Sequence, residues 1–308
     1  MKCWGNIAGS AFAVLVMGAV LYAFGGDLQS IDFANPRLVP GLVGAVAIYV
    51  CVILIGAFGW KLLLTAFAAA PMPWAAERQL LISQIGKYVP GNVVQYLGRA
   101  AMAVRSGVPA KTVGIALITE TAAILLGGFL AVAIAISSAP DLVAGLVRLL
   151  PDTSRAIWLG IAAAIFLLLL FGLAWTFSKR LRSQVRIRVG TLLIVILLYT
   201  IALLLLGLSL HLVIGALSAI PVPLPLSVAV FAAAWIAGLA TPGAPGGLGV
   251  RESVITLGLA PLLGGAAALS VALLHRGASV LGDVISFGLG MLLPNKATAL
   301  STSKNMAP

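Results

Sequence analysis

Two segments of the chain place an arginine shortly after a Pro-Gly break in otherwise apolar sequence. The first is 87–99, KYVPGNVVQYLGR, which ends at Arg99, and the second is 242–252, PGAPGGLGVRE, in which Arg251 is followed by Glu252. A helix that begins after such a break exposes backbone N–H groups, and these can hold a phosphate together with an arginine fork. The breaks consist of Pro90, Gly91, Pro242, Gly243, Pro245, Gly246 and Gly247.

Charged residues inside the apolar stretches are the predicted substrate-binding residues. A charge at the centre of a membrane helix costs about 2.5–3.5 kcal/mol, so it is seldom kept without a use. The alternative is that the arginines only hold helices in place through ion pairs, and the two roles can coexist. We expect Glu120 to be the counter-ion of Arg99 rather than part of a proton relay. The six residues are Arg99, Glu120, Arg251, Glu252, Arg276 and Asp283.

The sequence predicts no catalytic residue, no metal site and no cofactor. Cys3 and Cys51 form no CxxC pattern, and His211 and His275 lack nearby ligands, so the histidines are expected to form hydrogen bonds between helices. The HExxH and GxSxG motifs do not occur. We therefore do not expect an enzyme.

The composition excludes an ordinary water-soluble domain. Of 308 residues, 61% are hydrophobic and only 9% are charged, whereas soluble domains have about 25% charged residues. The net charge of +11 could point to nucleic acid, but the basic residues lie in short segments between apolar runs. That distribution is typical of the cytoplasmic loops of membrane proteins, so no nucleic-acid partner is predicted.

The apolar runs predict an all-α polytopic membrane protein with about six spanning helices and two re-entrant helical hairpins. The spans are expected at 4–24, 39–60, 112–137, 156–177, 191–217 and 264–292. The stretches 79–108 and 227–260 contain the Pro-Gly breaks, and a broken backbone at membrane depth must lie inside protein or beside a wet cavity. A single membrane domain is expected over 1–293, followed by a cytoplasmic tail at 294–308.

The two halves, about 4–137 and 156–292, are predicted to form an inverted repeat. The basic loop 178–190 is expected on the cytoplasmic side of the membrane, because cytoplasmic loops are rich in Lys and Arg. Counting the spans from this loop makes both termini cytoplasmic. Gly86, Pro90, Gly91, Arg99 and Pro109 recur 152 residues later as Gly238, Pro242, Gly243, Arg251 and Pro261. A chance match in a chain with 34 Gly and 16 Pro is the alternative.

The motifs KYVPGNVVQYLGR and PGAPGGLGVRE resemble, in order, those of the lysylphosphatidylglycerol synthase transmembrane-region family, the flippase half of the multiple peptide resistance factor. Glu120 and Arg276 match a Glu and an Arg of that family, and the resemblance covers roughly 39–292. It implies a bacterial or archaeal inner-membrane protein that moves a phospholipid or polyprenyl-linked lipid between leaflets. The soluble domain that transfers lysine is not expected in these 308 residues, so synthase activity is not implied.

The leading expectation is a lipid translocase whose hairpins meet near the midplane and bound a cavity, with the headgroup phosphate held by Arg99 and Arg251. Short members of the family resemble accessory proteins of hopanoid, glycolipid or cell-envelope pathways, so the transported lipid stays open. The alternative is a non-transporting scaffold or subunit that holds a lipid-modifying enzyme or glycosyltransferase at the membrane. The sequence leaves the energy source and the oligomeric state open.

Overall fold

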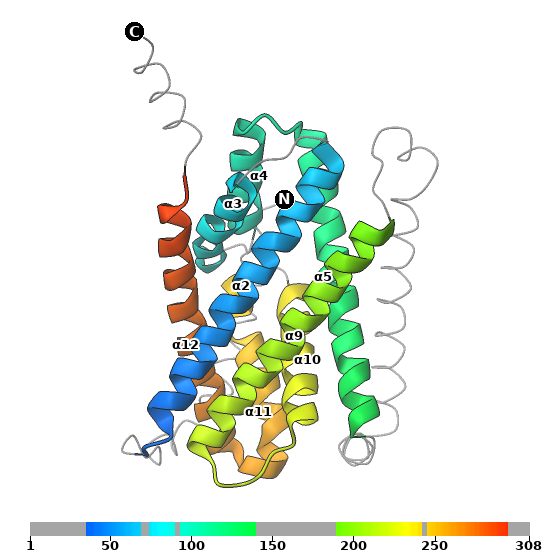
Figure 1. The fold of residues 1–308 in the computed structure, drawn as a ribbon. Coiled ribbons are helices and arrows are strands. Elements are labelled where there is room, and N and C mark those ends of the chain that lie inside the picture. The colour runs from blue at the N-terminus through cyan, green and yellow to red at the C-terminus, as the bar shows by residue number, and fades with distance from the viewer. Residues whose placement is uncertain (1–34, 69–73, 90–92, 140–188, 242–244, 295–308) are drawn as a thin grey trace, which may run out of the picture.

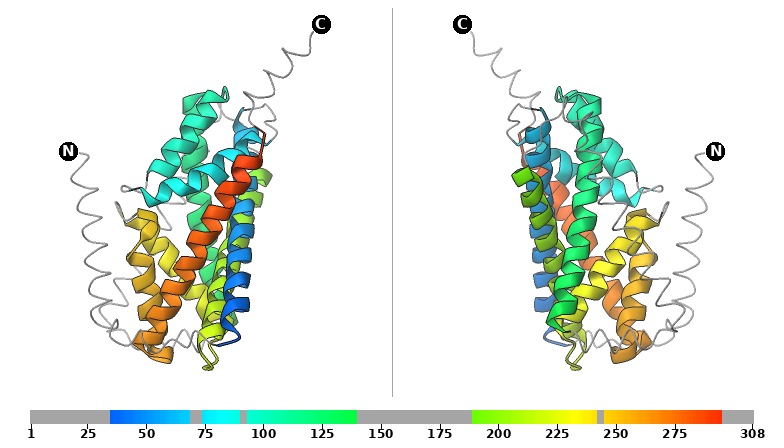
Figure 2. Two further views of the ribbon diagram at one scale, coloured as in Figure 1. Left: turned by 90° about the vertical axis from the view of Figure 1, so that its left-hand side faces the viewer. Right: turned by 90° about the vertical axis from the view of Figure 1, so that its right-hand side faces the viewer.

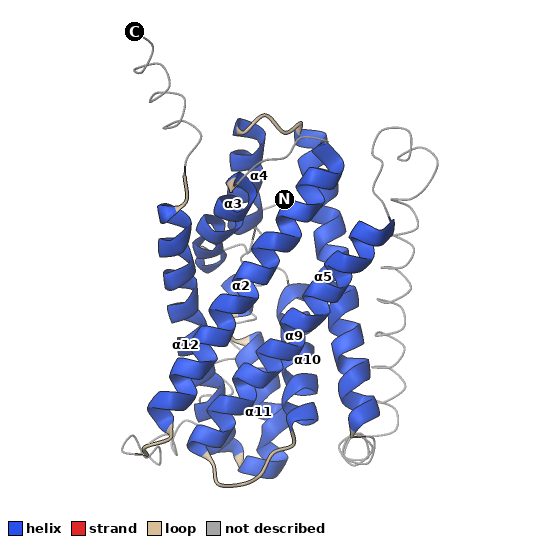
Figure 3. Ribbon diagram, viewed as in Figure 1, coloured by secondary structure: helices blue, strands red, loops and turns tan. Residues whose placement is uncertain are grey.

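Every regular element in the described part of the chain is helical (Figure 3). The computed structural model describes residues 35–68, 74–89, 93–139, 189–241 and 245–294. Four of its helices are long and apolar enough to cross a membrane. They are α2 (Leu38–Ala68), α5 (Ala110–Ser138), α9 (Val189–Leu217) and α12 (Gly265–Leu292). The chain is thus an all-α protein with the helices of a membrane protein.

These long helices coincide with four of the predicted apolar spans. The predictions at 112–137, 191–217 and 264–292 fall within two residues of the helix ends, whereas α2 continues beyond the predicted end at Trp60. No Gly or Pro interrupts 61–68, and the flexible side chain of Lys61 reaches Glu77 from the helix surface. The other two predicted spans, 4–24 and 156–177, lie outside the described residues, as does nearly all of the predicted tail.

The two stretches with Pro-Gly breaks are each divided into shorter helices, as expected. In the first, α3 (Ala75–Ser83) passes into a 3-10 turn, η2 (Gln84–Tyr88), and α4 (Val94–Arg105) follows. In the second, α10 (Leu224–Ala240) is followed by the 3-10 turn η3 (Pro245–Gly247) and by α11 (Val250–Leu263). Gly246, Gly247 and Gly249 have φ angles of 58°, 72° and 86°, a region that glycine adopts readily. The chain can therefore turn here before α11 begins.

The helices of the two halves have corresponding packing partners. The central helices α2 and α9 pack along each other, with α12 against α2 and α5 against α9 (Figure 1). Likewise α3 contacts α12 while α10 contacts α5. The pair α3 and α4 lies toward one end of the bundle, and the pair α10 and α11 lies toward the other (Figure 2). We call α3 with α4 the first broken pair and α10 with α11 the second. The turns η2 and η3, which lie between the helices of each pair, are in contact, so the two broken pairs meet inside the bundle.

Polar side chains add contacts at hydrogen-bond distance between helices. His275 on α12 lies 3.2 Å from the Ser209 hydroxyl on α9, measured from Nε2. His211 on α9 lies 3.3 Å from the Ser227 hydroxyl on α10, measured from Nδ1. Both histidines therefore form the interhelical contacts that the sequence predicted, and the apolar core packs around them.

Candidate functional site

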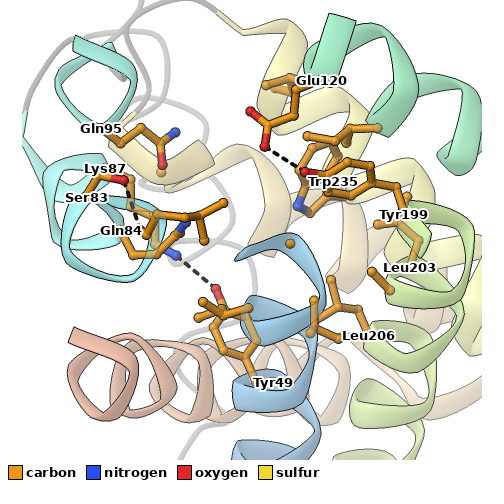
Figure 4. A pocket seen from close by; sticks show the side chains of 18 of the residues that line it. Tyr49, Ser83, Gln84, Lys87, Gln95, Glu120, Tyr199, Leu203, Leu206 and Trp235 are labelled. Carbon is orange, nitrogen blue, oxygen red and sulfur yellow. Dashed lines mark hydrogen bonds between the residues drawn. The ribbon is translucent and has the colours of Figure 1, made fainter. Parts of the chain in front are cut away.

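A cavity of about 150 Å³ lies inside the bundle. Its wall combines apolar side chains, among them Leu203, Leu206 and Phe231, with a group of polar and charged ones. Figure 4 shows labelled side chains of this wall, such as Tyr49, Glu120 and Leu206, projecting toward a common space from several helices. The wall includes residues of α2, α5 and α9 and of both broken helix pairs. Its polar members are Tyr49, Ser83, Gln84, Lys87, Gln95, Tyr96, Arg99, Glu120, Tyr199, Trp235 and Arg251.

Arg99 on α4 and Glu120 on α5 form a buried, two-pronged ion pair in the cavity wall. Arg99 Nη1 donates to Glu120 Oε1 at 2.9 Å, and Arg99 Nη2 donates to Oε2. The Tyr199 hydroxyl also donates to Glu120 Oε1, at 2.6 Å. The Arg99 guanidinium carbon lies 4.3 Å from the centre of the Trp60 ring. The predicted pairing of Glu120 with Arg99 is confirmed, and both carboxylate oxygens are occupied.

Arg251 on α11 lines the same cavity but forms no ion pair with any carboxylate that the structure describes. Its Nε is buried without a hydrogen-bond partner, and its guanidinium carbon lies 5.4 Å from the centre of the Trp235 ring. Gly238 and Gly247 provide the room for it. A Cβ on Gly238 would lie 2.8 Å from Arg251 Cγ, and a Cβ on Gly247 would lie 2.9 Å from its Nε.

Lys87 on η2 joins the first broken pair to α12. It donates to Asp283 Oδ1 at 2.7 Å and to the Tyr49 hydroxyl at 2.9 Å, while Tyr88 donates to Asp283. Asp283 is buried and does not line the cavity. Sequence reasoning did not single out Lys87, although a lysine three residues before Pro90 in an apolar stretch is a signal of the same kind as Arg99.

Glu252 and Arg276 stabilise the second broken pair from behind the cavity. The N–H of Gly249 donates to Glu252 Oε2 at 2.7 Å, which caps the start of α11. Arg276 Nη1 lies 3.6 Å from Glu252 Oε1 and donates to the carbonyl of Gly246 at 3.1 Å. Neither side chain lines the cavity.

The predicted site residues therefore fall into two groups. Arg99, Glu120 and Arg251 lie together on the cavity, whereas Glu252, Arg276 and Asp283 pair behind it. Among the break residues, Gly246 lines the cavity, Gly247 packs against Arg251, and Pro245 begins η3. Pro90, Gly91, Pro242 and Gly243 lie outside the described residues.

Sequence reasoning missed the uncharged part of the wall. Tyr49, Tyr199 and Trp235 lie in long apolar runs, and only the docking of the helices shows that they face the same space as Gln84 and Gln95. Within the described ranges no three metal-ligating side chains form a group. The wall can form hydrogen bonds and ion pairs, with the cations Lys87 and Arg99 on the first broken pair and Arg251 on the second.

The sequence matches no family model and no curated protein. The likeness to the lysylphosphatidylglycerol synthase transmembrane region thus rests on the two Pro-Gly motifs together with Glu120 and Arg276.

Proposed function

We propose that this chain is a lipid translocase that holds a headgroup phosphate in the cavity while the lipid tails stay in the bilayer. The observation that carries the proposal is Arg251, an arginine without a partner among the described carboxylates, on a cavity bounded by both broken helix pairs. A lipid phosphate that crosses hydrocarbon loses its water, and an arginine fork with neighbouring hydroxyl groups can replace that hydration.

In this proposal the four long helices span the membrane and the two broken pairs re-enter it from opposite sides. The positions of α3 with α4 and of α10 with α11 at opposite ends of the bundle support this topology (Figure 2). The corresponding partners of α2 and α9, and of α12 and α5, support an inverted repeat. Transporters built from such repeats place their substrate site near the midplane, between the halves. The contact of η2 with η3 fits that location.

The distribution of basic residues gives the proposed orientation in the inner membrane. Arg78, Arg105 and Lys111 lie on α3, at the end of α4 and at the start of α5, which gather at one end of the bundle (Figure 1). Arg37 precedes α2 at the other end. Because cytoplasmic loops are enriched in Lys and Arg, the end that carries α3 and α4 faces the cytoplasm.

The transport test compares wild-type protein with Arg251→Gln in liposomes that contain a fluorescent phospholipid, whose outer-leaflet copies are bleached by an impermeant reductant. We expect the variant to insert and purify as a single species but to move lipid about ten- to a hundredfold more slowly. That loss corresponds to about 1.5–3 kcal/mol, the usual contribution of a hydrogen bond to a charged group. Arg251→Lys should rescue only partly, since an ammonium lacks the planar fork.

The control is Glu77→Gln, which removes a carboxylate that pairs with Lys61 away from the cavity. It should leave the rate of lipid movement unchanged. A wild-type protein that moves no lipid at all would contradict the translocase and favour the scaffold role. Full transport by Arg251→Gln would refute the phosphate site.

A further inference from the structure

The charged side chains on the cavity wall and directly behind it do not balance. Four cations, Lys87, Arg99, Arg251 and Arg276, lie there among three carboxylates. Asp283 pairs with Lys87, Glu120 with Arg99, and Glu252 with Arg276. The fourth described carboxylate, Glu77, pairs with Lys61 outside this group. One positive charge is therefore left over in this part of the structure, and it belongs to Arg251.

The surplus charge faces the cavity and not another helix. Arg251 lines the cavity, and Gly238 and Gly247, which pack against it, have no side chain that could bond to it. Trp235 offers only the face of its ring. An arginine that is left unpaired inside protein is strongly unfavourable, so an anion in the cavity would complete the site.

The second arginine of the wall adds no net charge. Glu120 engages both terminal nitrogens of Arg99 and also accepts from Tyr199, so this pair enters the wall as a neutral unit. Each oxygen of Glu120 thus already has a partner, and its charge is matched by Arg99. A ligand with a cationic headgroup would add to the positive charge of the wall without meeting an unpaired carboxylate among the described residues.

Lys87, whose charge is matched by Asp283, and several uncharged donors and acceptors make up the remaining polar wall. Tyr49 accepts from Lys87, so its own hydroxyl hydrogen is free to donate. The amides of Gln84 and Gln95 also line the cavity, and amides bond well to hydroxyl groups. A volume of about 150 Å³ is roughly what one benzene-sized molecule occupies. The space therefore has room for a phosphate with one small substituent.

We propose that the cavity selects lipids whose headgroup carries a single net negative charge on a phosphodiester, together with a small uncharged hydroxyl-bearing group such as glycerol. This inference rests on the proposed phosphate site and narrows its substrate class. It disfavours lipids with a cationic aminoacyl headgroup, because they would place a second uncompensated positive charge beside Arg251. It also disfavours polyprenyl monophosphates and diphosphates, whose additional negative charge would exceed the surplus.

Equilibrium binding in nanodiscs tests the selectivity without any need for transport. The full chain is titrated with phosphatidylglycerol, phosphatidylethanolamine, phosphatidic acid and lysylphosphatidylglycerol of identical acyl chains, and bound lipid is counted by native mass spectrometry. We expect phosphatidylglycerol to bind at least about tenfold more tightly than the others, since mismatched charge in a buried site is costly. Equal binding of the four lipids, or tightest binding of the lysyl or the phosphatidic acid form, would overturn the proposal.

Soluble competitors separate a lipid from a free phosphate compound as the ligand. Glycerophosphoglycerol, which is the same headgroup without acyl chains, should compete only at concentrations more than about a hundredfold higher, because each buried CH₂ group adds to the affinity of the lipid. Inorganic phosphate should compete no better. Displacement of phosphatidylglycerol by an equal concentration of glycerophosphoglycerol would make the ligand a soluble phosphodiester and refute the lipid assignment.

Changing the charge balance should change the preference. Glu120→Gln raises the surplus to two positive charges, so it should shift the preference toward phosphatidic acid, whose phosphomonoester carries about −1.5 to −2 charges. Glu77→Gln makes the same change in total charge away from the cavity and should leave the preference for phosphatidylglycerol intact. Identical lipid preferences in both variants would show that the charge count does not select the ligand.

The binding and transport experiments test the headgroup selectivity and the translocase separately, so either proposal can be refuted while the other stands. Selective binding of phosphatidylglycerol without lipid movement would refute the translocase and keep the charge-matched site. Lipid movement that depends on Arg251 but does not discriminate among headgroups would keep the translocase and refute the selectivity.

Discussion

Lys87 and Asp283 connect the first broken helix pair to the last helix through a buried ion pair. The Lys87 side chain is 10% exposed and that of Asp283 is 0% exposed, and their closest N–O distance is 2.6 Å. Bringing two charges out of water is costly, and their mutual attraction offsets the cost only while both are present. The loss of one partner should therefore be far more damaging than the loss of both.

Lys87→Met is expected to lower the free energy of unfolding by about 3–5 kcal/mol, because it leaves the Asp283 carboxylate buried without its cation. The double variant Lys87→Met with Asp283→Asn should recover most of that loss, since no charge is then stranded. Denaturant titration of the protein in detergent, followed by tryptophan fluorescence, gives the free energies.

Lys61→Met is the matched control, since Lys61 also pairs with a carboxylate but its side chain is 34% exposed. It should cost only about 0–1 kcal/mol, the range for exposed ion pairs. If Lys87→Met proves as mild as Lys61→Met, the pair with Asp283 does not hold η2 against α12.

Only some residue-level contacts could be predicted from the sequence. Arg99 and Glu120 are 21 residues apart on consecutive elements, and charges are scarce enough there that their pairing could be anticipated. Lys87 and Asp283 are 196 residues apart, so their contact depends on how the two halves dock. The same docking leaves Arg251 without an ion pair to a described carboxylate. Glu252, the residue that follows Arg251, pairs with Arg276 instead.

At the scale of elements, glycines set how closely the helices approach. A Cβ on Gly207 of α9 would lie 2.5 Å from the Cα of Val228 on α10. Because that contact is to backbone, neither helix can yield by rotating a side chain. The close approach positions α10, which carries Phe231 and Trp235 of the cavity wall.

Gly207→Ala is expected to lower stability by about 1–3 kcal/mol, the usual cost of forcing extra volume into a packed interior. Gly215→Ala on the same helix is the control, since no atom lies within 4 Å of the Cβ it would add. It should be neutral or stabilising, because alanine favours a helix over glycine by about 1 kcal/mol. Thermal unfolding in detergent compares the two variants, and equal melting temperatures would contradict the tight contact between α9 and α10.

The sequence was a good guide to the type of element and a weaker one to its ends. Apolar runs predicted the four long helices, and the Pro-Gly pairs predicted that the stretches 79–108 and 227–260 are not single helices. The first broken pair nevertheless begins earlier, at Ala75, and the second extends from Leu224, just after Pro223, to Leu263, before Gly264. Gly264 has a φ of 80°, which ends α11 at the residue where the last predicted span begins.

At the scale of the whole molecule, the docking of the halves creates the cavity. No single helix contains it, because its wall comes from α2, α5, α9 and both broken pairs. The charged residues near the cavity could be predicted from the sequence. The cavity itself, and the lack of a carboxylate partner for Arg251 among the described residues, could not. The proposed alternating access requires that this space open toward each face of the membrane in turn. The ends of the long helices must therefore lie on the sides of the membrane that the inverted repeat predicts.

The topology can be tested with single cysteines at helix ends, after Cys3 and Cys51 have been replaced by alanine. Ala110 is exposed at the start of α5, on the end proposed to face the cytoplasm, and Ile220 is 47% exposed between α9 and α10, at the other end. With an impermeant maleimide, Ile220→Cys should be labelled in intact cells, whereas Ala110→Cys should be labelled only after permeabilisation. Ala123→Cys, at a fully buried position, should stay unlabelled in both cases. Labelling of both end positions from the same side would show that α5 and α9 do not cross the membrane as proposed, and the inverted repeat would then no longer account for a cavity between the two broken pairs.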